Sequence, residues 1–165
     1  MTGVQTCALP IWRRLGTQLQ ETLLPEKLSV REVLELFRSF QPTRLSVSEV
    51  MALVRLEEKA STWVRNLSGG QQRMVEVGRT LMTDPTVMLV DEPTAGLAKL
   101  LSEEVYEMLV KLTDTGITIV LVDQEIRQAL KIADYVYVLE LGRNKYEGPV
   151  DEFSDPADLK KAFWA

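Results

Sequence analysis

Apolar residues recur in this chain with two different periods, and their alternation predicts an α/β fold. The runs at 87–90 and 117–122 carry no charged residue, which is typical of strands buried in a parallel sheet. The segments 71–82 and 102–112 place apolar residues every three or four positions, which predicts an amphipathic helix before each run. A short strand is also predicted at 12–19. We expect a mostly parallel sheet with helices on both faces and the two apolar runs as adjacent strands.

Serine residues mark three predicted helix starts. Two of them have a glutamate three positions later, the spacing of a capping box, in which each side chain bonds to the other residue's backbone N–H. Apolar residues at helical spacing follow both boxes, so a small all-helical lobe is expected over residues 29–66. The predicted caps are Ser29 with Glu32, Ser46 with Glu49, and Ser102.

The last third of the chain predicts a helix, a hairpin and a final helix. Residues 125–133 have a helical pattern, and the alternating apolar run at 135–139 predicts a strand. Gly142-Arg143-Asn144 is expected to form the hairpin turn, with 145–147 as the return strand. The tail, 148–165, fits a final helix.

Composition narrows the class of protein. The 165 residues are 45% hydrophobic and 26% charged, which is ordinary globular composition, and the net charge of −5 argues against a nucleic-acid partner. The chain has no histidine, which excludes an imidazole base and histidine metal ligands. Its single cysteine, Cys7, cannot form an internal disulfide, and no apolar run approaches the ~20 residues of a membrane span. We therefore expect a reducing, aqueous compartment.

The first eleven residues, 1–11, follow neither a helical nor a strand period and carry no charge. They resemble the translation of a sequencing-library adapter fused to a truncated reading frame, and such a segment is left out of fold reasoning. The alternative is a genuine but unstructured tail. If the adapter interpretation holds, the true gene begins upstream.

Two adjacent carboxylates follow the apolar run at 87–90. A buried parallel strand that ends in Asp91 and Glu92 delivers both acids to the carboxyl edge of the sheet. In a phosphoryl-transfer site one such carboxylate can hold Mg²⁺, usually through water, while its neighbour orients or deprotonates the attacking water. The alternative is a solvated strand end.

A second stretch suited to phosphate chemistry is Ser68-Gly69-Gly70-Gln71, at the start of a predicted helix. Glycine lets the backbone approach a ligand closely, and the unpaired N–H groups of a helix start attract a terminal phosphate. The alternative is a Gly-Gly turn capped by Ser68.

Both stretches resemble motifs of one family. Leu67-Ser68-Gly69-Gly70-Gln71 resembles the signature motif of the ATP-binding cassette (ABC) ATPases, and Val87-Met88-Leu89-Val90-Asp91-Glu92-Pro93 resembles their Walker B motif. They occur in the family's order, with a predicted helix between them. The resemblance implies a partial P-loop NTPase fold of the ABC type, with a truncated ATPase domain over 12–165. Residues 29–66 would be its helical subdomain, and 67–165 would carry the signature, Walker B, D-loop and switch.

The resemblance also implies cofactors, ATP and Mg²⁺, and roles for single residues. Glu92 would be the catalytic base, and Asp91 would hold Mg²⁺ through water. Gln20, at the Q-loop position, would contact ATP and Mg²⁺. Gln124, at the switch position, would act in catalysis and sense the γ-phosphate together with Gln20. The signature residues would contact ATP held by a partner subunit: Ser68, Gly69, Gly70 and Gln71.

Two positions depart from the general family pattern. Ala98 stands where most members carry an aspartate, and Gln124 stands where most carry a histidine. A glutamine can donate a hydrogen bond to a γ-phosphate but cannot carry a proton, so the alternative for Gln124 is a degenerate switch. Both departures are familiar in the ATPase subunits of branched-chain amino acid importers, which the chain from Gln71 onward resembles. Residues 16–38 resemble the multidrug-export type instead, so 12–66 and 67–165 are hypothesised to come from two misjoined genes.

The expected function is ATP hydrolysis that drives branched-chain amino acid import. The alternatives are a multidrug-export ATPase, a non-catalytic interaction module, and an ABC ATPase outside transport. Expected partners are a second ABC ATPase subunit, head to tail, and transmembrane permease subunits, which would hold the protein at the cytoplasmic face of the cell membrane; no nucleic acid is expected.

The phosphate-binding loop of such ATPases is missing from this sequence. No Gly-x-x-x-x-Gly-Lys-Ser/Thr occurs between Met1 and Ala165, so the chain alone is expected to be inactive. A sheet without the family's first strands is also expected to expose an apolar edge and face.

Overall fold

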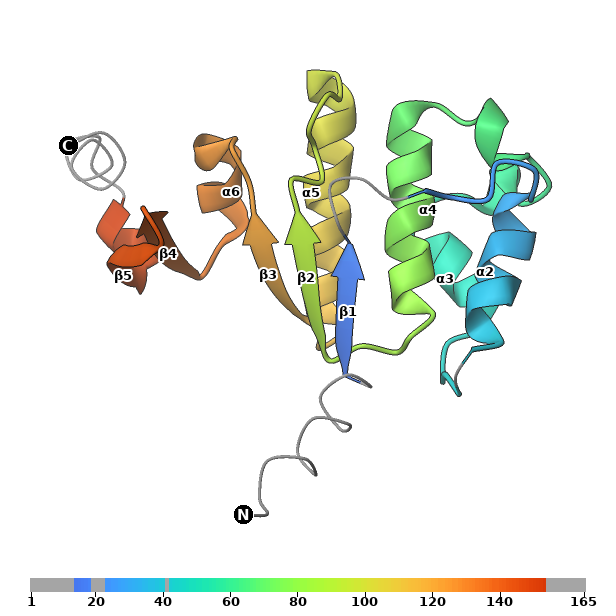
Figure 1. Cartoon of the computed structure of the whole chain (residues 1–165), viewed down its shortest axis with the longest axis horizontal. Helices are drawn as coiled ribbons and strands as arrows, with labels where there is room; N and C mark the ends of the chain where they lie inside the picture. The colour runs from blue at the N-terminus through green and yellow to red at the C-terminus, as the bar shows by residue number, and fades with distance from the viewer. Residues whose placement is uncertain (1–13, 19–22, 41, 154–165) are drawn as a thin grey trace, which may run out of the picture. The chain divides into compact units, whose positions relative to one another are not determined.

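The computed structural model describes residues 14–18, 23–40 and 42–153 (Figure 1). The chain forms two compact units, Met1–Gln124 and Glu125–Ala165. The first unit contains a parallel sheet, two long helices and a lobe of shorter helices, and the second contains a helix and a hairpin. The predicted α/β class with a small helical lobe is therefore confirmed.

The sheet of the first unit has three parallel strands in the order β1 (Leu15–Gln18), β2 (Val87–Asp91) and β3 (Thr118–Val122). The two predicted apolar strands are adjacent, as expected, and the predicted strand near the N-terminus pairs with β2. Gly16 lets a helix pack closely over β1, because a Cβ at Gly16 would lie 2.5 Å from Thr80 Cγ2 of that helix.

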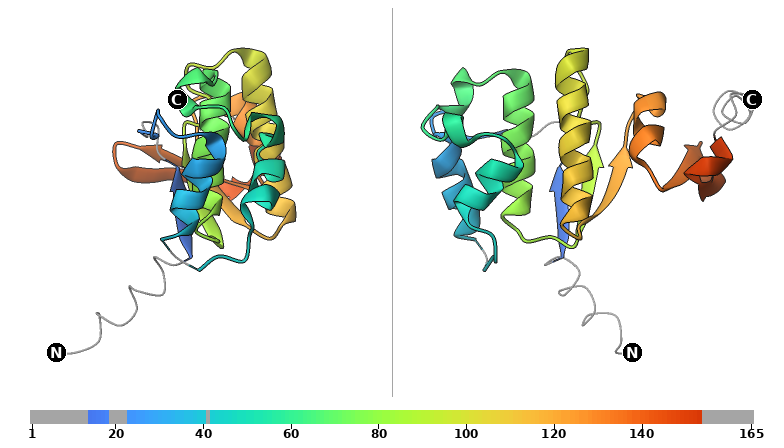
Figure 2. Two further views of the ribbon diagram at one scale, coloured as in Figure 1. Left: turned by 90° about the vertical axis from the view of Figure 1, so that its right-hand side faces the viewer. Right: turned by 180° about the vertical axis from the view of Figure 1, so that it is seen from behind.

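Two helices, α4 (Gly69–Leu81) and α5 (Lys99–Asp114), cover one face of this sheet. Figure 1 shows α5 behind the strands, and the reverse view of Figure 2 shows it in front of them. Met88 and Val90 are buried on the covered face, whereas Leu89, Val120 and Val122 are 36%, 47% and 57% exposed. Among the described residues of the first unit, helices thus cover one face of the sheet, where helices on both faces were expected, and the other face is the expected exposed apolar face.

The two long helices begin in different ways. Ser68 caps α4, and the helix starts at Gly69, two residues before its predicted start. The helix α5 starts at Lys99 with Ala98 at the N-cap, so the prediction that Ser102 caps it was wrong. The turn at Gly96, where φ is +74°, lets the chain enter α5 earlier, and the Ser102 hydroxyl donates to the Ala98 carbonyl inside the first turn at 3.4 Å. The predicted apolar stripe of α5 is buried, as expected.

The helical lobe lies on the outer side of α4. Both predicted capping boxes are present, and they start α2 (Val30–Arg38) and α3 (Val47–Leu53). Two short 3₁₀ helices, η1 (Glu57–Lys59) and η2 (Val64–Asn66), complete the lobe. Gly78 of α4 allows the close approach, because a Cβ there would lie 3.2 Å from Leu34 of α2 and 3.4 Å from Val50 of α3.

The second unit contains α6 (Ile126–Ile132), the antiparallel strands β4 (Tyr135–Glu140) and β5 (Arg143–Pro149), and η3 (Val150–Phe153). The predicted helix and hairpin are confirmed, but the turn is Leu141-Gly142, and Arg143 and Asn144 belong to the return strand. Both turn residues have positive φ, +48° and +74°, which is the backbone of a two-residue type I′ hairpin loop. The predicted final helix lies largely in 154–165, outside the described residues.

In the described ranges, no helix combines the length and the apolar character that crossing a membrane requires.

A buried carboxylate, Glu76, lies between α4 and the sheet. It accepts a hydrogen bond from Arg73 at 2.9 Å and one from the buried Gln18 of β1 at 3.5 Å. Burial raises the pKa of Glu76 above its usual range, and the hydrogen bond from Arg73 acts in the opposite direction. A carboxyl with a raised folded-state pKa binds its proton more tightly when folded, so the stability of the fold depends on pH through this residue.

We expect wild type to lose stability relative to Glu76→Gln as pH rises. The contribution of Glu76 is fully present below its unfolded pKa of about 4.3 and is lost as pH rises through the higher folded pKa. Urea midpoints of both proteins between about pH 3 and pH 7 measure this difference.

The matched control is Glu32→Gln, for which the expected pH dependence has the opposite sign. The backbone hydrogen bond from Ser29 lowers the pKa of Glu32, so its contribution is present above the unfolded pKa and is lost as pH falls. If both variants gave differences with the same pH slope, the pKa directions assigned to the two residues would be incorrect.

Candidate functional site

The backbone of Glu92 is held against the end of the neighbouring strand. Glu92 directly follows β2 and has φ of +43°, in the left-handed region that residues with a side chain rarely adopt. Its N–H donates to the Val122 carbonyl of β3 at 2.8 Å, and its carbonyl accepts from Ala95 N–H at 3.1 Å. A residue stays in such a conformation when its surroundings fix it, and this strain is common at functional sites.

The structure brings the two predicted catalytic residues together. The Gln124 side-chain amide, just past β3, donates from Nε2 to Glu92 Oε1 at 2.6 Å. Glu92 is therefore held at its backbone by Val122 and at its carboxylate by Gln124. The predicted contact of Gln124 with a γ-phosphate stays a prediction, and in the structure its amide bonds to the carboxylate of the predicted base.

Asp91 is the last residue of β2 and lies beside Val122 in the parallel register. Because strand residues alternate between faces, Asp91 shares the open face of the sheet with Leu89. Across the described segments, no group of three or more acidic, cysteine or histidine side chains could hold a metal. Mg²⁺ commonly uses one or two protein carboxylates together with water and substrate phosphates, so the Asp91-Glu92 pair fits a nucleotide-bound Mg²⁺. Gln20, the other predicted Mg²⁺ contact, lies outside the described residues.

A buried hydroxyl cluster beside this site was not predicted from the sequence. Tyr106 of α5 donates to Asp123 Oδ2 at 2.9 Å, and Thr94 Oγ1 lies 3.4 Å from both the Tyr106 hydroxyl and Asp123 Oδ2. Tyr106 and Thr94 are buried. The signal available in the sequence was a tyrosine within the apolar stripe of α5, because a buried tyrosine hydroxyl usually finds a polar partner.

The signature stretch forms the first turn of α4. Ser68 Oγ accepts from Gln71 N–H at 3.3 Å, and Gln71 Oε1 accepts from Ser68 N–H at 3.0 Å, a reciprocal capping box. The two glycines differ: Gly69 is exposed, whereas Gly70 is buried, and a Cβ there would lie 3.3 Å from Leu101 of α5. Close ligand approach is thus open at Gly69, and Gly70 packs the starts of the two helices together. Figure 1 shows the start of α4 at the same end of the sheet as the carboxyl ends of the strands.

Removing the Ser68 hydroxyl is expected to destabilise the protein by about 1 kcal/mol, because an N-terminal backbone donor of α4 loses its acceptor. The urea midpoint of Ser68→Ala measures this loss. Ser102→Ala is the matched control, since Ser102 lies within the first turn of α5 and does not cap it. Equal shifts in the two variants would contradict a capping role for Ser68.

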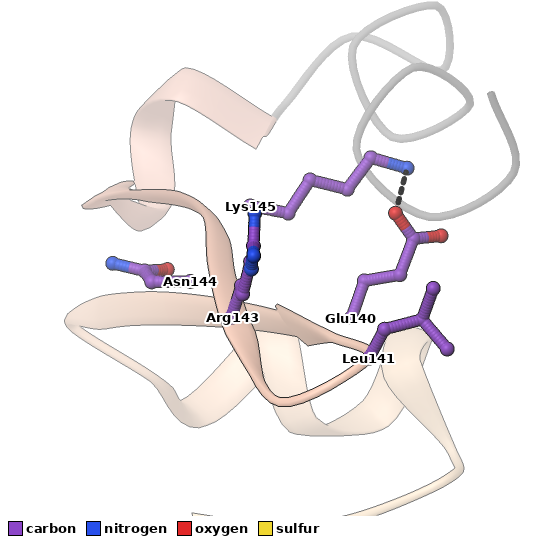
Figure 3. Close-up of a pocket in the computed structure, with 5 residues that line it drawn as sticks. All are labelled: Glu140, Leu141, Arg143, Asn144 and Lys145. Atoms are coloured by element: carbon purple, nitrogen blue, oxygen red, sulfur yellow. Dashed lines mark ion pairs between the residues drawn. The ribbon is translucent and has the colours of Figure 1, made fainter.

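The second unit contains a shallow depression at the hairpin turn, lined by residues of β4, the turn and β5 (Figure 3). In Figure 3 the Lys145 and Glu140 side chains point toward each other, and their charged groups are 3.3 Å apart. The lining includes no pair of carboxylates and no hydroxyl, so the catalytic residues predicted from the sequence have no counterpart here. The lining residues are Glu140, Leu141, Arg143, Asn144 and Lys145.

The fold is shared with solved ATP-binding cassettes. CbiO1 from Clostridium perfringens, part of the ABC transporter complex CbiONQ, superposes with a TM-score of 0.79 at 24% identity, covering 93% of this chain and 64% of CbiO1. The ADP conformation of MJ1267, an ATP-binding cassette of an ABC transporter, gives 0.76 at 23% identity, covering 92% and 69%. This chain therefore has the ABC-type P-loop NTPase fold. Its parallel sheet ends in two carboxylates beside a capped, glycine-rich helix start.

Sequence comparisons identify the family. The family model described as ABC transporter matches residues 8–95, and the chain belongs to this family. The branched-chain amino acid transport ATP-binding protein BraG of Pseudomonas aeruginosa is 44% identical over 89 residues, covering 54% of this chain and 38% of BraG. The glutamate/aspartate import ATP-binding protein GltL of Escherichia coli K12 is 34% identical over 142 residues, covering 85% and 59%. The chain thus spans between two fifths and three fifths of the length of these relatives.

Proposed function

We propose that this chain is part of the ATP-hydrolysing subunit of an ABC importer for amino acids, with branched-chain amino acids as the substrate. The observation that carries the proposal is the double hold on Glu92, by the Val122 carbonyl at 2.8 Å and by Gln124 Nε2 at 2.6 Å. A solvated strand end has no need for a carboxylate fixed in this way. The similarity to BraG and GltL, whose names specify amino acid transport, supports the class of substrate.

Glu92 is the group that would accept a proton from the attacking water. A carboxylate has about four acceptor positions, so the bond from Gln124 orients Glu92 without using its whole acceptor capacity. Gln124 donates only through its amide and cannot take up the proton itself. Mg²⁺ bound to ATP would neutralise the charge on the transferring phosphoryl group, and Asp91 is the carboxylate that would hold it.

The signature turn would bind ATP held by a second ATPase subunit, in a head-to-tail pair. Ser68 and Gln71 fix the first turn of α4, and the exposed Gly69 leaves its backbone accessible to a phosphate. Transmembrane permease subunits are the remaining proposed partners.

The purified chain is expected to show no Mg²⁺-dependent ATP hydrolysis, because residues 1–165 contain no Gly-x-x-x-x-Gly-Lys-Ser/Thr loop to hold the phosphates. The complete subunit, with such a loop, is expected to turn over at about 1–10³ s⁻¹. Phosphate release from both proteins, with and without Mg²⁺, tests the proposal. A chain that hydrolysed ATP, with activity lost in Glu92→Gln, would show that the phosphate loop is dispensable; an inactive complete subunit would contradict the enzyme assignment.

Export is the second candidate function, favoured by one observation. The Nod factor export ATP-binding protein I of Cupriavidus metallidurans is 37% identical over 101 residues, covering 61% of this chain and 33% of that protein. A continuous single-molecule DNA read through the locus separates the candidates. Permease genes with a periplasmic binding-protein gene would support import, and a single permease gene would support export. The same read tests whether residues 12–66 and 67–165 come from one gene.

A further inference from the structure

Tyr106 lies near the middle of α5, on the buried side of the helix, and its hydroxyl contacts polar groups. The side chain is buried, and its hydroxyl donates to Asp123 Oδ2 at 2.9 Å. A hydrogen bond to a charged acceptor is stronger than one between neutral groups, so this contact ties the middle of α5 to the end of β3.

Asp123 stands between the two residues that hold Glu92. The preceding residue, Val122, accepts the Glu92 N–H at its carbonyl, and the following residue, Gln124, donates to the Glu92 carboxylate. A displacement of Asp123 would therefore move both contacts together. The Tyr106 hydroxyl, on α5, restrains the Asp123 side chain through this hydrogen bond.

Thr94, in the turn that follows Glu92, contacts the same two residues, Tyr106 and Asp123. It lies two residues after Glu92, is buried, and places Oγ1 3.4 Å from both the Tyr106 hydroxyl and Asp123 Oδ2. The turn after β2 and the end of β3 are thus connected to the same position of α5.

We propose that Tyr106 is a positioning residue for ATP hydrolysis: through Asp123 it fixes the Gln124 amide that orients the Glu92 carboxylate. The proposal rests on the proposed function. Tyr106 acts at a distance from the reacting atoms, so it should change the rate of the chemical step and leave the affinity for ATP unchanged.

The experiment compares Tyr106→Phe with wild type in the complete subunit. Loss of a hydrogen bond to a charged group is expected to lower kcat about 3- to 30-fold, with KM for ATP unchanged. Asp123→Asn keeps an acceptor oxygen for the tyrosine and is expected to retain most of the activity. Asp123→Ala should reproduce the defect of Tyr106→Phe, and the double variant should be no worse than either single variant.

A second measurement needs no ATP. In this chain, the side-chain amide signals of Gln124 in a ¹H–¹⁵N spectrum are expected to shift in Tyr106→Phe and to stay in place in Tyr137→Phe, which alters an exposed tyrosine of β4. An unchanged Gln124 signal in Tyr106→Phe would overturn the proposal, whether or not the urea midpoint falls. An unchanged kcat, in a subunit that Glu92→Gln inactivates, would overturn it and leave the proposed function intact. Inactivity of the wild-type subunit would contradict the proposed function and would leave the Tyr106 proposal to the second measurement. The Gln124 signal in this chain would then show whether Tyr106 positions the Gln124 amide.

Discussion

Replacing Glu92 by glutamine in the complete subunit is expected to lower kcat for ATP hydrolysis by about 10²–10⁴-fold, the usual contribution of a general base. Glutamine has nearly the same shape, and its carbonyl oxygen can still accept the bond that Gln124 Nε2 donates to Glu92 Oε1 at 2.6 Å. The geometry is therefore kept while the ability to take up a proton is lost. Affinity for ATP should change little, and steady-state phosphate release with a nucleotide-binding titration measures both quantities.

Glu104→Gln is the matched control, because Glu104 is an exposed glutamate of α5. Its kcat is expected to equal that of wild type. If Glu92→Gln kept more than about a tenth of the activity, a loss of under about 1.4 kcal/mol in transition-state stabilisation, the base would have to be another group. If Glu92→Gln also lost affinity for ATP, Glu92 would contribute to ATP binding as well as to the chemical step.

The elements of the fold that depend on local sequence were the predictable ones. Ser29 and Ser46 start helices because their capping boxes are complete within four residues. The run 87–90 became a strand because it is short, wholly apolar and bounded by turn residues. Where the start of a helix depends on a preceding turn, as at Ala98 before α5, the serine signal at Ser102 was misleading.

Burial was harder to predict than secondary structure, because it depends on residues far away in the sequence. The run 117–122 has the composition of a buried strand, yet Val120 and Val122 are exposed on the open face. Gln18 is polar and fully buried. Its hydrogen-bond partner, Glu76, comes 58 positions later on α4, so the local sequence did not indicate this burial. Composition reports how apolar a segment is and does not say which element covers it.

In the candidate site, too, local features could be predicted from the sequence and contacts between distant residues could not. The motifs predict Asp91, Glu92 and Gln124 as site residues from their types and order, which are local properties of the sequence. The hydrogen bonds between Glu92 and Gln124 and between Tyr106 and Asp123 required the structure, since they join residues 32 and 17 positions apart across separate elements. Tyr106 in particular was indistinguishable from a packing residue in the pattern of α5.

The helix that carries Tyr106 is also expected to be a main source of stability. Leu109 of α5 is 1% exposed, and Leu109→Ala should lower the free energy of unfolding by about 2–5 kcal/mol through lost burial and the cavity left behind. Typical domains have about 5–15 kcal/mol in total, so this is a large fraction. Val110→Ala is the matched control: Val110 is the next residue of the same helix, is 40% exposed, and should lose about 0.5 kcal/mol or less.

Urea unfolding followed by circular dichroism measures both variants, with an unchanged slope required for the comparison. Equal losses of unfolding free energy in Leu109→Ala and Val110→Ala would mean that α5 does not bury its apolar stripe. The expected difference would instead show that α5 is fixed on the sheet by its apolar stripe. The proposed positioning role of Tyr106 depends on that fixation, because a hydroxyl on α5 can hold Asp123 in place only if the helix itself does not move. Leu109→Ala should therefore also weaken the hold on Gln124, and the Gln124 amide signals should shift in the same direction as in Tyr106→Phe.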